Sequence, residues 1–358
     1  MTSDMRVTLT QFLIESRRRY PQATGDFNSL LLNVALVCKR IARKVAAGAL
    51  HGVAGMPAQD QEQGRLAAVS NQLFIEGNNW GGYLAGMSSE DMDAPCQIPD
   101  VYPKGRYLLV FDPLDGSSNL DVNVSVGSIF SVLRAPEREH GISAENISAE
   151  DFLQPGTEQV AAGYAIYGPT TMLMLTVGNG VNGFTLCPQL GEFMLTHPNL
   201  RIAPDTQEFA INASNSRFWE DPIRRYVNEC MAGKAGRRGK DFSMRWIAST
   251  VAEAHRILMR GGVFLSPRDT RAPEIPGHVR LLHEANPIGF LIEQAGGRAS
   301  TGRQPVRMVK PVSLHQRIGL IFGSRHEVEL IERYHTSSAA EELPNPLFGE
   351  RSLFRSPF

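Results

Sequence analysis

A short apolar run that ends in two closely spaced carboxylates constrains this chain more than any other feature of its sequence. Tyr107–Phe111 predicts a buried strand, and the following segment, Asp112–Asn119, is acidic and rich in glycine and serine. The strand is expected to stop abruptly at Asp112, so that Asp112 and Asp115 enter a tight turn shaped by one proline and one glycine. Two carboxylates delivered to a turn by a buried strand indicate a functional site.

The acidic turn combines acceptors for a cation with donors for an anion. Asp112 and Asp115 can face one pair of hard cations, and the Leu114 carbonyl can point the same way. Backbone N–H groups and hydroxyls that suit a phosphate come from Gly116, Ser117 and Ser118. Carboxylates for magnesium beside donors for phosphate are what metal-assisted phosphoryl chemistry requires. An ordinary surface turn is the alternative, and the apolar strand in front argues against it.

Two other acidic segments could complete such a site. Glu90, Asp91 and Asp93 follow a short apolar stretch, and alone they favour a solvated helix start over a ligand role. Glu284 precedes an Asn-Pro pair that predicts a sharp helix start with Asn286 as N-cap, and there a dipole-stabilised carboxylate and a ligand are equally favoured. A basic cluster that is usually a solvated loop, but could hold a second phosphate, comprises Lys234, Arg237, Arg238, Lys240 and Arg245.

Composition excludes several classes of protein. Hydrophobic residues make up 42% and charged residues 20% of the 358 positions, which excludes wholesale disorder. The net charge of −1 gives no reason to expect a nucleic-acid partner or an acidic membrane surface. No apolar run approaches the ~18 residues of a spanning helix, and no secretion signal is recognisable at the N-terminus. Four scattered cysteines fit a reducing compartment, so we expect a cytoplasmic protein.

Strand and helix patterns alternate in both halves, which predicts an α/β fold of packed sheets and helices. Helices are expected at Leu30–Ala47 and Leu66–Glu76, with a mobile loop at Gly52–Gly64 between them and a polar surface insert at Pro136–Gly156. Further helices are expected at Asp221–Ala232, Trp246–Met259, Pro287–Ala295 and His326–His335. We expect an N-terminal domain at 1–198, a C-terminal domain at 199–335 and a loose tail at 336–358.

The chain resembles class I fructose-1,6-bisphosphatases over nearly all of residues 5–335. The matching segments are Phe111–Asp121, Gln154–Gly168, Arg245–Pro267 and Arg280–Gly297. The first is shared with inositol monophosphatases, and the other three are specific to the bisphosphatases. The resemblance implies a two-domain, five-layer αβαβα sandwich and a homotetramer. It also implies hydrolysis of the 1-phosphate of fructose 1,6-bisphosphate, in either gluconeogenesis or carbon fixation, with two or more Mg²⁺ per subunit.

The resemblance assigns roles to individual residues. The metals would be held by Glu90, Asp112, Asp115, Glu284 and the Leu114 carbonyl. The reacting phosphate would be cradled by Asp115, Gly116, Ser117 and Ser118. The distal phosphate would be bound by Asn212, by His278 in place of a lysine, and by Arg245 of a neighbouring subunit. Thr24–Asp26 and Arg106–Tyr107 resemble parts of an AMP pocket, and AMP regulation stays open.

Several positions depart from the family pattern. Ala67 stands where the family has an aspartate that helps to activate water, and Asp91 replaces a glutamate. The base would then come from Asp91, our catalytic candidate, or from Asp60 or Glu62. Changes in the sugar pocket are His278, Ser266, Trp246 and Asn215. We therefore expect a slow phosphatase, with a sedoheptulose 1,7-bisphosphatase or a catalytically weak sugar-phosphate-binding paralogue as alternatives.

Overall fold

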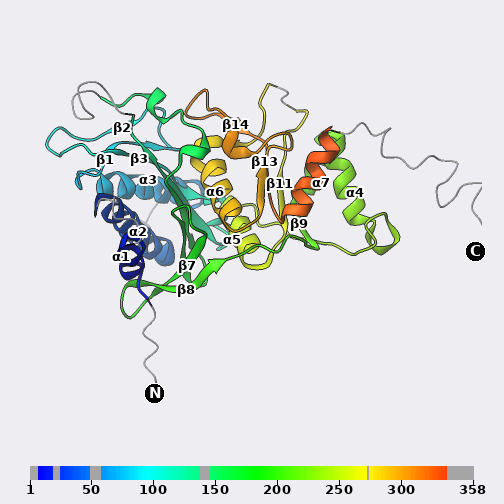
Figure 1. Ribbon diagram of the computed structural model, residues 1–358, viewed down its shortest axis with the longest axis horizontal. Helices are drawn as coiled ribbons and strands as arrows, with labels where there is room; N and C mark the ends of the chain where they lie inside the picture. The colour runs from blue at the N-terminus through cyan, green and yellow to red at the C-terminus, as the bar shows by residue number, and fades with distance from the viewer. Residues whose placement is uncertain (1–6, 19–24, 49–57, 137–145, 272–273, 337–358) are drawn as a thin grey trace, which may run out of the picture.

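The computed structural model describes residues 7–18, 25–48, 58–136, 146–271 and 274–336, and the side chains of α3 from residue 64 onward. Figure 1 shows five layers in the order helices, sheet, helices, sheet, helices. This arrangement confirms the expected αβαβα sandwich. No helix in these ranges has the length and apolar character needed to cross a membrane.

The larger sheet has eight strands among the described residues, in the order β2-β1-β3-β4-β5-β6-β7-β8. Its strands are β1 (Leu84–Ser89), β2 (Cys96–Gln97), β3 (Tyr107–Asp115), β4 (Val126–Arg134), β5 (Ala161–Tyr167), β6 (Thr171–Thr176), β7 (Val181–Cys187) and β8 (Glu192–Leu200). β1 and β3 pair in parallel, and the other neighbours are antiparallel. Every residue of β3 is buried, because helices cover both faces of the sheet.

One outer layer consists of α1 (Leu9–Arg18), α2 (Gly25–Ala47) and α3 (Ala58–Asn78). Their apolar faces join the core of the larger sheet, where the Phe74 ring stacks on Phe111 with centroids 4.6 Å apart. The expected loop Gly52–Gly64 is wrong from residue 58 onward, since α3 begins there; residues 52–57 lie outside the described part. Good helix formers such as Ala, Gln and Glu dominate 58–63, and they favour a helix without apolar periodicity.

The middle layer consists of α5 (Thr250–Arg260) and α6 (Asn286–Gln294), packed between the two sheets. The expected start of the α5 helix at Trp246 is wrong by four residues. Ala248 has a left-handed φ of 60°, and the Ser249 hydroxyl caps the helix by accepting from the Ala252 N–H at 3.2 Å. The left-handed Ala248 and the capping Ser249 therefore set the start of the helix at Thr250, although the apolar pattern begins earlier, at Trp246.

The second sheet has the order β10-β9-β11-β15-β13. Its strands are β9 (Glu208–Ile211), β10 (Ser243–Met244), β11 (Val263–Ser266), β13 (Arg298–Ser300) and β15 (Leu320–Gly323). The last helical layer, α4 (Asp221–Met231) and α7 (Arg325–Thr336), covers its outer face and closes a third core. A separate antiparallel pair is formed by β12 (Val279–Arg280) and β14 (Arg317–Ile318), and β12 leads directly into the segment that carries Glu284.

The expected polar insert at Pro136–Gly156 is also partly wrong. Residues 137–145 lie outside the described part, but the remainder contributes Ile147 and Phe152 to a buried cluster. The 3-10 turn Ala149–Phe152 turns the Phe152 ring inward, where it is fully buried. Two apolar residues in a polar stretch are too few to produce a periodic pattern, which explains the error. The expected loose tail lies outside the described residues from 337 onward.

Candidate active site

Three buried carboxylates converge where β3 ends. Oxygens of Asp112, Asp115 and Glu284 lie within 4.8 Å of one another. The strand does not stop at Asp112 as expected, but continues to Asp115 through an irregularity in its pairing with β4. A bulge of this kind redirects side chains, and it allows two carboxylates three residues apart to face one point. The convergence with Glu284 is the property that distinguishes a site from a surface turn.

Hydrogen bonds fix the orientation of the two strand carboxylates. The Leu114 N–H donates to Asp112 Oδ1 at 2.9 Å, within the bulge itself. Asp115 Oδ2 accepts from the Ser249 hydroxyl at 2.6 Å and from the Val251 N–H at 2.9 Å, at the N-terminus of α5. The helix N-terminus favours a negative charge there. The segment before α5 therefore positions Asp115, a role that sequence analysis missed although the segment lies within a matching region.

Glu284 lies on a π-helical turn, Leu281–Ala285, that leads directly into α6. The predicted N-cap role of Asn286 is wrong, because its φ of −65° and ψ of −51° are helical. The Glu284 carboxylate accepts from the Arg280 N–H at 2.7 Å and from the Thr250 hydroxyl at 3.1 Å. The wider π turn satisfies the backbone with no capping side chain and leaves the Glu284 side chain facing the cluster.

Glu90 lies beside this cluster, immediately after β1. Its N–H donates to the Phe111 carbonyl at 3.0 Å, so the parallel pairing of β1 with β3 brings Glu90 next to Asp112. Arg280 Nε donates to Glu90 Oε1 at 3.2 Å. The favoured interpretation of Glu90 and its neighbours as a helix start is wrong, because the chain leaves a strand there. Partial desolvation and the charge of Glu90 raise the pKa of Asp91, the next residue.

The carboxylates disfavour one another's charge in the absence of a cation. Burial and the charges of Glu90, Asp115 and Glu284 raise the pKa of Asp112 well above its usual range. Burial and the charges of Glu90 and Asp115 likewise raise the pKa of Glu284 well above its usual range. The pKa of Asp115 is also raised by burial, although its hydrogen bonds from Ser249 and Val251 oppose the effect. Hard oxygen ligands with uncompensated negative charge are the donor set that Mg²⁺ requires, so these residues fit such an ion.

The turn after the cluster requires glycine at its first position. Gly116 has a φ of 72°, and a Cβ atom there would come within 2.7 Å of the Ser249 side chain. Ser117–Asn119 then forms a 3-10 turn, closed by donation from the Asn119 N–H to the Gly116 carbonyl at 2.8 Å. Backbone N–H groups in a turn of this kind are suited to bind an anion beside the carboxylates.

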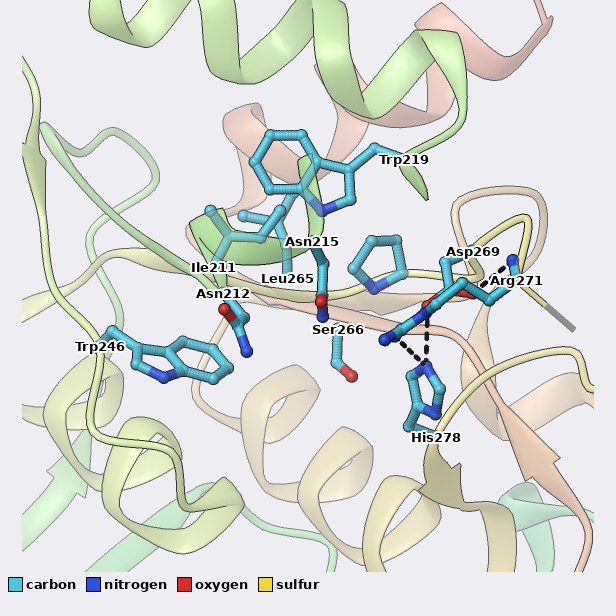
Figure 2. Close-up of a pocket in the computed structure, with 11 residues that line it drawn as sticks. Ile211, Asn212, Asn215, Trp219, Trp246, Leu265, Ser266, Asp269, Arg271 and His278 are labelled. Atoms are coloured by element: carbon cyan, nitrogen blue, oxygen red, sulfur yellow. Dashed lines mark hydrogen bonds and ion pairs between the residues drawn. The ribbon is translucent and has the colours of Figure 1, made fainter. Parts of the chain in front are cut away.

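A cavity of about 270 Å³ lies in the second half of the chain (Figure 2). Its lining residues are Ile211, Asn212, Asn215, Trp219, Trp246, Leu265, Ser266, Pro267, Asp269, Arg271 and His278. Two pocket residues are close in sequence to residues at the acidic cluster. Trp246 is three residues before Ser249, and His278 is six residues before Glu284. The structure therefore brings Asn212 and His278 together, along with the departures Asn215, Trp246 and Ser266. Asp269 and Arg271 were not singled out from the sequence.

Arg245 does not line this pocket. Its side chain is half exposed, and its Nε lies 3.6 Å from Glu208. The remaining basic cluster is largely neutralised, because Arg238 and Lys240 pair with the buried Glu327 at 2.7 and 3.6 Å, and Lys234 pairs with Asp241. These ion pairs favour a structural role for the cluster over a second phosphate site.

A layered two-domain fold with a buried carboxylate cluster beside a glycine-led 3-10 turn is the architecture of a class of sugar phosphatases. Sequence models described as the N-terminal and C-terminal domains of fructose-1-6-bisphosphatase match residues 7–198 and 202–336. The chain belongs to the fructose-1,6-bisphosphatase family, which confirms the resemblance seen in the sequence.

Individual relatives agree with this assignment. A fructose-1,6-bisphosphatase class 1 from Hydrogenophilus thermoluteolus is 65% identical over 353 residues, covering 97% of each chain. Another, from Methylibium petroleiphilum, is 58% identical over 358 residues and covers 99% of each chain. The crystal structure of Leishmania major fructose-1,6-bisphosphatase in holo form superposes with a TM-score of 0.83 at 35% identity. That match covers 93% of this chain and 100% of the Leishmania chain.

Proposed function

We propose that this chain is a phosphoric monoester hydrolase that removes the 1-phosphate of fructose 1,6-bisphosphate, giving fructose 6-phosphate and inorganic phosphate. The convergence of Asp112, Asp115 and Glu284 on one point is the observation that carries the proposal. Relatives named fructose-1,6-bisphosphatase class 1 match almost the whole chain at 65% and 58% identity. We further propose that the enzyme works as a cytoplasmic homotetramer, which light scattering in solution would test.

The acidic cluster would hold two or more Mg²⁺ ions. The proposed ligands are the side chains of Glu90, Asp112, Asp115 and Glu284 and the carbonyl of Leu114. Bound there, magnesium would stabilise charge on the attacking and leaving oxygens of an in-line displacement. The protein holds Asp115 and Glu284 in place with hydrogen bonds from the N-terminal turn of α5, and these bonds keep the ligands oriented before an ion arrives.

The phosphates of the substrate would occupy two places. The turn Gly116–Ser118 would receive the reacting phosphate, since it directly follows Asp115 in the chain and offers N–H groups and hydroxyls. The cavity that contains Asn212 and His278 would receive the distal phosphate, with Arg245 reaching it from a neighbouring subunit. Asp91 would serve as the base that orients the attacking water, because Ala67 offers no carboxylate and Asp91 directly follows Glu90 in the chain.

A panel of sugar phosphates tests the proposed reaction. Phosphate release from fructose 1,6-bisphosphate should require Mg²⁺ and should exceed release from sedoheptulose 1,7-bisphosphate and from sugar monophosphates. A second candidate substrate is sedoheptulose 1,7-bisphosphate. The observation that favours it is the presence of three departures from the family pattern in the pocket wall, at Ser266, Asn215 and His278. No release from any member of the panel with Mg²⁺ present would contradict hydrolysis and favour a sugar-phosphate-binding protein.

Magnesium should also stabilise the folded chain, and more strongly at pH 8 than at pH 6. The raised pKa values of Asp112, Asp115 and Glu284 mean that the folded metal-free state binds protons more readily than the unfolded state. The associated stability is present at low pH and is lost as pH rises through the raised values. Mg²⁺ at 100 times its Kd then adds about 2.7 kcal/mol, while at pH 6 protons compete with it.

Thermal unfolding followed by circular dichroism measures this effect. The melting temperature with Mg²⁺ is compared with that in NaCl of equal ionic strength, at both pH values. A similar rise with NaCl, or a larger rise at pH 6 than at pH 8, would contradict a metal site at these carboxylates.

A further inference from the structure

Asp269, Arg271 and His278 form one hydrogen-bonded cluster in the pocket wall (Figure 2). The Asp269 carboxylate is almost fully buried, with 7% of the residue exposed. Its Oδ2 accepts from Arg271 Nε at 2.9 Å and from Arg271 Nη2, and it lies 3.0 Å from His278 Nε2. Its Oδ1 accepts from the backbone N–H of Arg271 at 3.0 Å. One carboxylate therefore fixes both the Arg271 and the His278 side chain.

The Arg271 side chain is held in place from a second side. Its guanidinium lies over the Phe218 ring, 4.9 Å from the centroid. The backbone is fixed nearby, since Thr270 N–H donates to the Phe218 carbonyl at 3.0 Å and Asp269 pairs with Trp219 as an isolated bridge. The side chain nevertheless stays 40% exposed. A preorganised guanidinium that still reaches the cavity loses little conformational entropy when it binds an anion.

Both side chains keep unused hydrogen-bonding groups. Arg271 donates to Asp269 through Nε and Nη2, so the N–H groups of Nη1 have no hydrogen-bond partner among the described residues. His278 Nε2 lies closer to the Asp269 carboxylate, at 3.0 Å, than to Arg271 Nη2, at 3.4 Å, which favours a proton on Nε2. Nδ1 then accepts from the P–OH of a phosphate monoanion or, when the ring is protonated, donates to a dianion.

The other described residues that line the pocket carry no competing charge. Of the described residues that line it, Asp269, Arg271 and His278 are the ionisable ones, and the others are apolar side chains or neutral amides and hydroxyls. Arg317 Nη1 donates to the His278 carbonyl at 2.6 Å from the neighbouring strand β14, which adds positive potential to the same wall. An anion that enters the cavity therefore meets the Arg271 guanidinium and the His278 ring on this side.

We propose that Arg271 is a substrate-binding residue for the distal phosphate, acting together with His278, and that Asp269 is the positioning residue for both. This inference rests on the proposed function, because it assigns the phosphate that is not hydrolysed to the wall formed by these residues. Specificity for bisphosphates over monophosphates then depends on Arg271 of the same chain as well as on groups supplied by a neighbouring subunit.

Comparing substrates with and without the distal phosphate tests the proposal. Arg271→Ala should raise KM for fructose 1,6-bisphosphate about 10–100-fold, the loss expected for a charged hydrogen-bond pair, with little change in kcat. KM for fructose 1-phosphate, which lacks the distal phosphate, should not change. Arg271→Lys should recover part of the loss, because a lysine keeps the charge without the planar fork. Asp269→Asn should raise KM for the bisphosphate in the same direction.

The matched control is Arg217→Ala. Arg217 lies over the same Phe218 ring at 4.5 Å but does not line the pocket, so its loss should leave both KM values unchanged. An Arg271→Ala variant that impairs fructose 1-phosphate as much as the bisphosphate, or impairs neither, would overturn the proposal. The proposal would also be overturned if Arg217→Ala changed the two KM values as much as Arg271→Ala does.

Calorimetric binding of fructose 6-phosphate separates this inference from the proposed reaction. The sugar carries the distal phosphate alone and needs no turnover, so Arg271→Ala should weaken its binding about 10–100-fold. If the wild-type chain hydrolyses no phosphate but shows this loss, the proposed function fails and the assignment of Arg271 holds. If the wild-type chain hydrolyses the bisphosphate and the variant binds fructose 6-phosphate normally, only the assignment of Arg271 fails.

Discussion

Asp112→Asn is expected to reduce magnesium-dependent phosphate release by about 10³-fold or more, without weakening the metal-free fold. The amide keeps an oxygen that can accept the Leu114 N–H, so the bulge in β3 should persist. It removes a charge that Glu90, Asp115 and Glu284 repel, so the metal-free variant should be at least as stable as wild type. Loss of one carboxylate ligand removes several kcal/mol of charge stabilisation, which corresponds to the stated rate effect.

Phosphate release and thermal unfolding, each with and without Mg²⁺, measure both parts of this prediction. Asp100→Asn is the control, because that carboxylate is 97% exposed and its ion pair with Lys104 spans 3.9 Å. It should change neither the rate nor the stabilisation by Mg²⁺. A variant Asp112→Asn that keeps a tenth of the wild-type rate would show that this carboxylate is not a ligand.

Ala67→Asp is expected to increase turnover by about 10²-fold, the lower end of what a general base contributes. Ala67 is partly buried on α3, which packs against β3 and against the turn Ser117–Asn119. An added carboxylate on this helix face can therefore approach the region of the acidic cluster. The gain should appear in kcat, with KM little changed, because the base acts on water and does not bind the sugar.

The neighbouring residue supplies the control for this gain. Ala68 is exposed, about 100° further around the helix, so Ala68→Asp should leave turnover unchanged. If Ala67→Asp shows no gain while the wild-type enzyme is fast, the base is supplied elsewhere. Asp91→Asn would then be expected to reduce turnover on the same 10²–10⁴ scale.

The sequence predicted the parts of the site that depend on neighbouring residues. The turn after β3 could be recognised because an apolar strand, two carboxylates and a glycine lie within a few positions of one another. Glu90 could not be assigned as a ligand from its neighbours in the sequence, because they favoured a solvated helix start. Glu284 could not be assigned either, because its neighbours gave equal weight to a metal ligand and to a carboxylate stabilised by the helix dipole. Their convergence on Asp112 depends on the parallel pairing of β1 with β3 and on a π turn, which no short pattern specifies.

Errors in secondary structure have similar physical causes. The early start of α3 follows from helix propensity without an apolar face, and the late start of α5 follows from a left-handed residue and a capping serine. Ser249 and Thr250 were missed as site residues for a different reason: their hydroxyls donate to carboxylates that lie more than thirty positions away in the chain. Arg271 was missed because arginine in a turn is common, and only its shared carboxylate makes it distinctive.

The hydrogen bonds to Asp115 and Glu90 have a mechanical consequence. Asp115 lies on the larger sheet but accepts hydrogen bonds from Ser249 and Val251, at the start of α5 in the second half of the chain. Glu90, which follows β1, likewise accepts a hydrogen bond from Arg280 of the second half. The candidate active site thus contains hydrogen bonds between the two halves of the molecule, in addition to the apolar core that the two sheets share. A displacement of one half relative to the other would therefore change the hydrogen bonds that hold Asp115 and Glu90 in place.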